Sequence, residues 1–172
     1  MKNIVLIGMP GCGKSTLGVL LAKELGMDFV DTDIVIQQRT GQLLQTTLDE
    51  RGVEGLLDEE EAAIRSLDMS KGRVIATGGS AVLRENSAEY LRKNSVCVYL
   101  SLKLEDIEKR VRNRKTRGIA ADKNMTLADI FEYRTPFYER CADITVCCSG
   151  YSPEENVAFI VNALYSRNTF LI

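Results

Sequence analysis

The chain has 172 residues and a formal net charge of −2, so it has the size of one domain that can bury a core. Its acidic balance argues against binding to nucleic acid or to a membrane surface, and favours a small-molecule substrate. The chain contains no histidine, which excludes Ser-His-Asp and Cys-His catalysis and imidazole metal sites. Carboxylates, lysine, arginine and a bound metal ion remain as available chemistry.

The cysteines and the N-terminus indicate a cytoplasmic protein. The five cysteines are odd in number and lack metal-ligand spacing, so we expect reduced core thiols, including the adjacent pair Cys147 and Cys148 in a buried strand. The first apolar run, residues 4–7, is cut short by a glycine loop and does not resemble a signal peptide. No apolar run approaches the roughly 20 residues of a membrane span.

The first predicted strand, residues 4–7, leads into Gly8-Met9-Pro10-Gly11-Cys12-Gly13-Lys14-Ser15, and a helical pattern follows. This matches G-x-x-x-x-G-K-[ST] in the order of strand, loop and helix that a phosphate-binding loop requires. The alternative is a glycine turn that binds nothing, but such a turn has no need of the Lys-Ser pair. We predict that residues 11–16, namely Gly11, Cys12, Gly13, Lys14, Ser15 and Thr16, cradle the phosphates of ATP, with Lys14 at the β- and γ-phosphates and Ser15 on Mg²⁺.

Four further strands are predicted along the chain, at residues 27–30, 73–77, 96–100 and 144–148. A helical excursion of about residues 33–68 breaks near Gly52, and its acidic run 58–61 reads as a solvated face. Helical patterns follow the fourth strand at 104–111 and recur at 126–141, with Pro136 inside, and at 157–164. Residues 110–123 are polar and rich in arginine, as is typical of a mobile flap.

Alternating strands and helices predict an α/β fold with a parallel sheet covered on both faces, within one domain. Ligands in such sheets gather at the carboxyl ends of the strands. The glycine loop, Asp31-Thr32-Asp33 and Gly78-Gly79 each follow a predicted strand directly. The sequence therefore predicts one pocket built from these three strand ends.

Phosphoryl transfer needs positioned phosphates, neutralised charge and an oriented hydroxyl. We expect Asp31 to hold a metal-bound water and Asp33 to orient the acceptor hydroxyl, the alternative being that one of them caps the next helix. Gly78-Gly79 is interpreted as an open turn that lets a ligand approach the backbone, or else as a plain loop. One flap arginine could reach the transferring phosphate, and the others read as solvated charges.

Together these residues resemble the shikimate kinases, within the nucleoside-monophosphate-kinase-like P-loop proteins. The resemblance covers essentially the whole chain and rests on residues 8–16, 29–33 and 77–79, Arg117, and Arg134 within 133–138. It implies a three-layer fold with sheet order 2-3-1-4-5, a lid near 112–124, and a monomer. It also implies that Asp33, Gly78, Gly79 and Arg134 bind a shikimate-like acceptor, that Ser15 and Asp31 serve Mg²⁺, and that Arg117 is a catalytic contact to ATP.

The sequence departs from the family pattern mainly on the acceptor side. Leu56-Leu57 stands where the family usually has Phe-Arg, Ser80 replaces a third glycine, and Gly118 follows Arg117 where proline is usual. The loop that normally flanks adenine lacks its arginine, so Tyr151 could stack on the base.

Three functions stay open from the sequence: a shikimate kinase, a sister kinase acting on another polyol or sugar acid, and a non-catalytic nucleotide-binding regulator. Arg51 or Arg65 could supply the missing clamp if the helix is shifted. The physiological acceptor is not decided by these residues.

Overall fold

The fold was obtained as a computed structural model, which describes residues 2–111, 118–122 and 124–167. Five strands form one sheet in the order β2-β3-β1-β4-β5, and every neighbouring pair is parallel. The predicted α/β class and strand order are therefore confirmed. The elements in chain order are β1 (Asn3–Ile7), α1 (Lys14–Leu25), β2 (Asp28–Asp31), α2 (Thr32–Thr40), α3 (Leu44–Ser66), β3 (Arg73–Ala76), α4 (Glu85–Asn94), β4 (Ser95–Ser101), α5 (Leu104–Arg110), α6 (Leu127–Cys141), β5 (Ile144–Cys147) and α7 (Pro153–Ser166).

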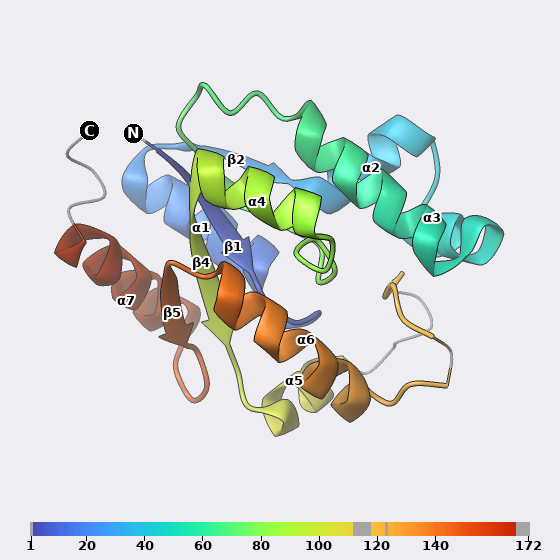
Figure 1. Cartoon of the computed structure of the whole chain (residues 1–172). Coiled ribbons are helices and arrows are strands. Elements are labelled where there is room, and N and C mark those ends of the chain that lie inside the picture. Colours follow the sequence, from blue (N-terminus) through green and yellow to red (C-terminus); the bar gives the residue numbers. More distant parts are fainter. Residues whose placement is uncertain (1, 112–117, 123, 168–172) are drawn as a thin grey trace.

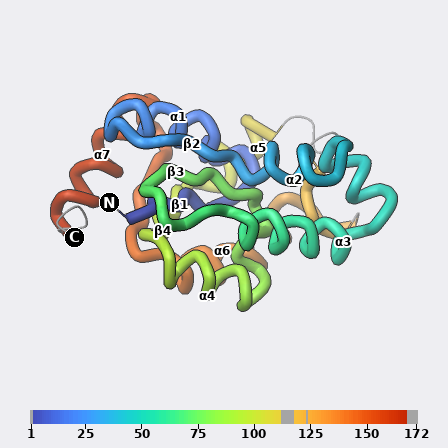
Figure 2. The backbone as a smooth tube through the Cα atoms, turned by 90° about the horizontal axis from the view of Figure 1, so that it is seen from above, coloured from blue at the N-terminus to red at the C-terminus, as the bar shows by residue number. Residues whose placement is uncertain are grey.

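Helices cover both faces of the sheet (Figure 1). Figure 2 shows α1 and α7 on one face and α4 and α6 on the other, with α2 and α3 extending beyond one end of the sheet. The central strand β1 is buried at all five positions, as expected for a strand enclosed on both faces. This layering leaves the carboxyl ends of the strands as the edge at which a site can form.

Two local features explain how α1 lies so close to the sheet. Gly13 caps its start with a left-handed backbone (φ 99°), a conformation that glycine adopts at little cost. A Cβ at Gly18 would lie 2.5 Å from the Phe29 ring on β2, so glycine allows close contact between helix and strand. The P-loop is thereby held against the sheet edge.

Two expectations from the sequence change in this part of the structure. Residues 85–94, for which no element was predicted, form α4, whose buried side chains are only Ser87, Ala88 and Leu91. This stripe is too narrow to signal a helix in one sequence. The expectation of core thiols is wrong for Cys147, because β5 is an edge strand with alternating exposure and Cys147 lies on its exposed side.

The predicted break in the helical excursion is confirmed, since Gly52 has non-helical backbone angles within α3. Half of the predicted flap, and most of the predicted lid near 112–124, consist of residues 112–117 and 123, which lie outside the described residues. Within the described ranges, no helix has both the length and the apolar character needed to cross a membrane.

Candidate active site

A cavity of about 510 Å³ opens at the carboxyl ends of the strands. The structure brings ten of the twelve predicted site residues to its wall, from the P-loop, α1, α2, the turn after β3, and α6. Asp31 is not among the described residues that line the cavity, and Arg117 lies outside the described residues. The ten are Gly11, Cys12, Gly13, Lys14, Ser15, Thr16, Asp33, Gly78, Gly79 and Arg134.

The P-loop presents a backbone cradle and one buried ammonium group. Gly11 and Gly13 have positive φ angles of 81° and 99°, which non-glycine residues rarely adopt. Lys14 is 7% exposed, and its Nζ donates to the carbonyls of Gly8 at 2.8 Å and Met9 at 2.9 Å. These carbonyls hold the ammonium group inside the loop, within the cavity wall that Ser15 and Thr16 extend. Such a cradle fits a polyphosphate chain.

Asp31 and Asp33 have different surroundings. Asp31 caps α2, because its Oδ1 accepts the backbone N–H of Asp33 at 3.0 Å. Asp33 instead places its carboxyl group in the cavity, close to Gly78. Burial, and then the Asp31 charge, raise the pKa of Asp33 to about 6, while Lys14 opposes this shift. A carboxylate in this position can accept a proton from a hydroxyl group.

Glu60 is a site residue that the sequence reasoning missed. The prediction that residues 58–61 form a solvated face is wrong for Glu60, which is 6% exposed on the inner side of α3 and lines the cavity. Its Oε2 has no hydrogen-bond partner among the described residues. Burial raises the pKa of Glu60 to about 7, a hydrogen bond from the Ser80 side chain lowers it, and the Asp33 charge raises it again. The sequence pointed to Glu60 only indirectly, through Ser80, which stands where a third glycine is usual and whose side chain bonds to Glu60.

Arg134 brings a positive charge to the acceptor side of the cavity. It is 2% exposed, and its Nη2 donates to the carbonyl of Ala120 at 2.6 Å. A Cβ at Gly79 would lie 3.1 Å from Nη1 of Arg134 and 2.8 Å from the Pro10 ring. Glycine at position 79 therefore leaves room for Pro10 and the guanidinium group to lie against the same turn.

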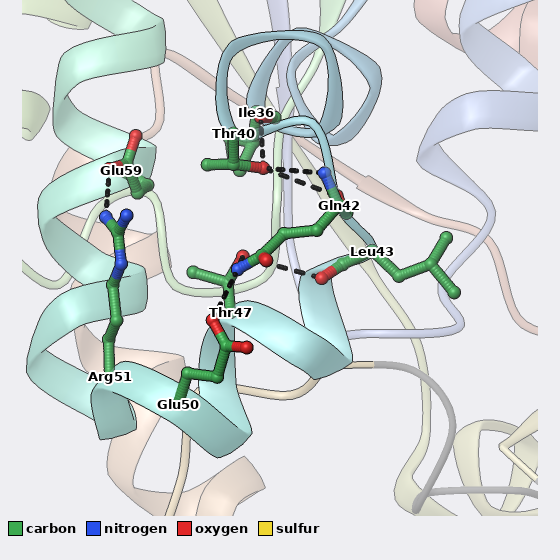
Figure 3. Close-up of polar contacts among 8 residues, drawn as sticks. All are labelled: Ile36, Thr40, Gln42, Leu43, Thr47, Glu50, Arg51 and Glu59. Carbon is green, nitrogen blue, oxygen red and sulfur yellow. Dashed lines mark hydrogen bonds and ion pairs between the residues drawn. The ribbon is translucent and has the colours of Figure 1, made fainter.

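The other two arginines considered as a clamp lie elsewhere. Arg51 pairs with Glu59 at 2.7 Å across the bend of α3 (Figure 3), and Arg65 pairs with Glu61 at 3.0 Å. Leu56 lines the main cavity. Leu57 lines a second cavity of about 400 Å³, which shares Ala120 and Arg134 with the first.

Polar contacts fix the corner between α2 and α3, just before the first half of α3. Gln42 Nε2 donates to the Thr47 hydroxyl at 3.1 Å and to Glu50 at 3.2 Å (Figure 3). Thr47 is fully buried, and its hydroxyl in turn donates to the carbonyl of Leu43 at 3.4 Å. The corner sets the direction of the first half of α3, before the break at Gly52.

A further part of the cavity wall consists of Arg110, Tyr151, Pro153 and Asn156. Arg110 ends α5, and the other three belong to the loop and first turns of α7. Tyr151 is half exposed and packs edge-on against Phe159, with ring centroids 4.9 Å apart. Stacking of Tyr151 on a base stays a prediction.

Comparison with known proteins gives a consistent result. A family model described as shikimate kinase matches residues 10–165. A shikimate kinase of Haemophilus influenzae is 37% identical over 95% of this chain and 90% of its own length, and one of Pseudomonas syringae is 39% identical over 85% and 86%. A solved structure of the Acinetobacter baumannii shikimate kinase in complex with shikimate superposes with a TM-score of 0.90, at 29% identity, over 97% of this chain and 94% of that one.

The parallel sheet, the phosphate loop at its edge and the adjoining carboxyl groups define a P-loop kinase that acts on small molecules. Within that class, the chain belongs to the shikimate kinase family.

Proposed function

We propose that this chain transfers the γ-phosphoryl group of ATP, with Mg²⁺, to a hydroxyl group of shikimate and so forms shikimate 3-phosphate. The observation that carries the proposal is that Lys14, Asp33 and Arg134 line one cavity. They supply a cation for phosphates, a base for a hydroxyl group and a guanidinium group for a carboxylate. The shikimate-bound relative from Acinetobacter baumannii supports the choice of acceptor.

Each residue has a part in the reaction. The loop amides and Lys14 would hold the triphosphate, and Ser15 would ligate the metal. Asp31, whose Oδ1 caps α2, would hold a metal-bound water through its other carboxylate oxygen. When bound, ATP supplies the phosphoryl group and Mg²⁺ neutralises phosphate charge. Asp33 orients the acceptor hydroxyl and accepts its proton as the new O–P bond forms and the bond from the γ-phosphorus to the bridging oxygen breaks. Arg134 binds the acceptor carboxylate, Gly78 and Gly79 let the acceptor approach the backbone, and Arg117 is proposed to contact the phosphates.

A sister kinase that acts on another polyol or sugar acid is the second candidate. It is favoured by one observation: Arg51 and Arg65 pair with glutamates outside the cavity, so α3 brings no guanidinium group to the acceptor. Losing one partner of a desolvated charge pair typically costs about 2 to 5 kcal/mol. An acceptor that does not need a second guanidinium group to bind its carboxylate would fit this cavity wall better.

A coupled assay of ADP release tests both candidates and the non-catalytic alternative. Shikimate, gluconate and nucleoside monophosphates would be compared with wild-type protein and with Lys14→Ala and Asp33→Asn. We expect turnover with shikimate, a loss of several orders of magnitude in both variants, and nearly unchanged ATP binding in Asp33→Asn. Turnover with gluconate alone would favour the sister kinase, and none with any acceptor would favour the regulator. We further propose that the protein acts as a monomer in the cytoplasm.

A further inference from the structure

Asn156 is a buried polar side chain to which the reaction described above assigns no role. It lies at the end of the first turn of α7, is 4% exposed and lines the cavity. Its Oδ1 has no hydrogen-bond partner among the described residues, while Nδ2 donates to the carbonyl of Tyr151 over 3.5 Å. A buried amide oxygen without a partner is destabilising, so packing alone does not explain an asparagine at this position.

The position of Asn156 in the cavity indicates what could approach it. The phosphates of a nucleotide are held at the start of α1, and the acceptor belongs on the side of Asp33 and Arg134. The nucleoside is therefore left with the remaining part of the wall, which Arg110, Tyr151 and Pro153 help to form. Asn156 lies in that wall, and its helix packs against α1.

The polarity of the amide group limits the ligand further. Because Nδ2 is directed to the Tyr151 carbonyl, the free end of the side chain is the acceptor Oδ1. Adenine carries an amino donor at position 6, whereas hypoxanthine and guanine carry a carbonyl oxygen there. An acceptor facing that position attracts the first base and repels the other two.

We infer that Asn156 Oδ1 accepts a hydrogen bond from the 6-amino group of the bound purine, and so selects adenine nucleotides over inosine and guanine nucleotides. This inference rests on the proposed use of ATP. It gives Asn156 a part in the choice of the phosphoryl donor, and it holds whichever acceptor is used.

Equilibrium binding of ADP and IDP to the full chain tests this inference without turnover. We expect wild type to bind ADP at least about tenfold more tightly than IDP, since each neutral hydrogen bond contributes about 1 kcal/mol and the carbonyl of IDP adds repulsion. Asn156→Leu should lose about tenfold in ADP affinity and little in IDP affinity. Asn156→Asp keeps an acceptor oxygen and should keep the preference for ADP. Asn162→Leu, at an exposed position of the same helix, is the matched control.

A purely structural role predicts different results. Asn156→Leu removes an unpaired amide oxygen together with one long hydrogen bond to Tyr151, so its Tm should change little; a clearly lower Tm with equal losses for ADP and IDP would overturn the inference. Equal affinity of wild type for the two diphosphates would also overturn it. If leucine does not fit, Asn156→Ala gives the same comparison. Binding of neither diphosphate by wild type would instead contradict the proposed function.

Discussion

Asp33 and Glu60 lie against the same glycine. A Cβ at Gly78 would be 2.2 Å from Glu60 Oε1 and 3.1 Å from Asp33 Oδ1, so the turn after β3 brings together carboxyl groups from α2 and α3. Glu60 is buried, and the Asp33 charge is one of the causes that raise the pKa of Glu60. The pair makes the acceptor side of the cavity sensitive to protonation.

The first prediction concerns the pH dependence of the reaction. Burial, and then Asp31, raise the pKa of Asp33 to about 6, and Asp33 must be ionised to accept a proton. We expect kcat/KM for the acceptor to fall about tenfold per pH unit below pH 6, because this quantity reports the groups of the enzyme form to which the acceptor binds. Steady-state rates at a fixed, saturating ATP concentration from pH 5 to pH 8 provide the measurement. A flat profile over that range would contradict the role of Asp33.

The second prediction concerns stability. Burial raises the pKa of Glu60 from 4.5 to about 7, so the folded chain binds this proton more tightly than the unfolded chain. The associated stability is fully present below about pH 4.5 and is lost as the pH rises through 7. Glu60→Gln is neutral at every pH, and we expect it to exceed wild type by on the order of 2 to 3 kcal/mol at pH 8 but not at pH 4.5.

Urea unfolding at the two pH values measures this difference. Glu59→Gln is the matched control, since Glu59 pairs with Arg51 outside the cavity, and it should lose less than about 1 kcal/mol at both pH values. A Glu60→Gln protein that is less stable than wild type at pH 8 would show that the carboxylate has a stabilising partner.

The third prediction concerns the turn at Gly79. In Gly79→Ala the new methyl group would lie 2.8 Å from the Pro10 ring and 3.1 Å from the Arg134 guanidinium group, so one of them must shift. We expect KM for the acceptor to rise about tenfold or more with KM for ATP little changed, since misplacement of about 1 Å can cost a hundredfold. An equal rise in both KM values would place the damage in the P-loop instead.

The fourth prediction concerns Leu57. Leu57→Arg would add a guanidinium group to the second cavity, which Arg134 also lines. We expect shikimate binding to tighten about tenfold or more, because a second cation would meet the carboxylate. Calorimetric titration with shikimate measures the effect, and Leu57→Met controls for volume without charge. A folded Leu57→Arg protein with unchanged affinity would indicate that Arg134 already satisfies the carboxylate.

The sequence by itself determined those parts of the site that lie within single short stretches. The P-loop could be recognised because its glycines, Lys14 and Ser15 act through the backbone of one loop. Asp33 could be proposed because it follows a strand end directly. The buried strands were visible as apolar runs, for the same reason: enclosure on both faces requires an apolar side chain at nearly every position.

Only the tertiary structure decided which side chains from distant elements meet. Glu60 stands in an acidic run that is typical of a solvated face, and the packing of the second half of α3 near the turn after β3 placed that one carboxyl group in the cavity. The pairing of Arg51 and Arg65 with glutamates outside the cavity followed from the same helix. The position of Asn156 at the cavity wall depends on the packing of α7 against α1. These outcomes depend on burial and on contacts between residues far apart in the sequence. Burial results from the packing of the helices on the sheet, so it cannot be predicted from a short stretch of residues.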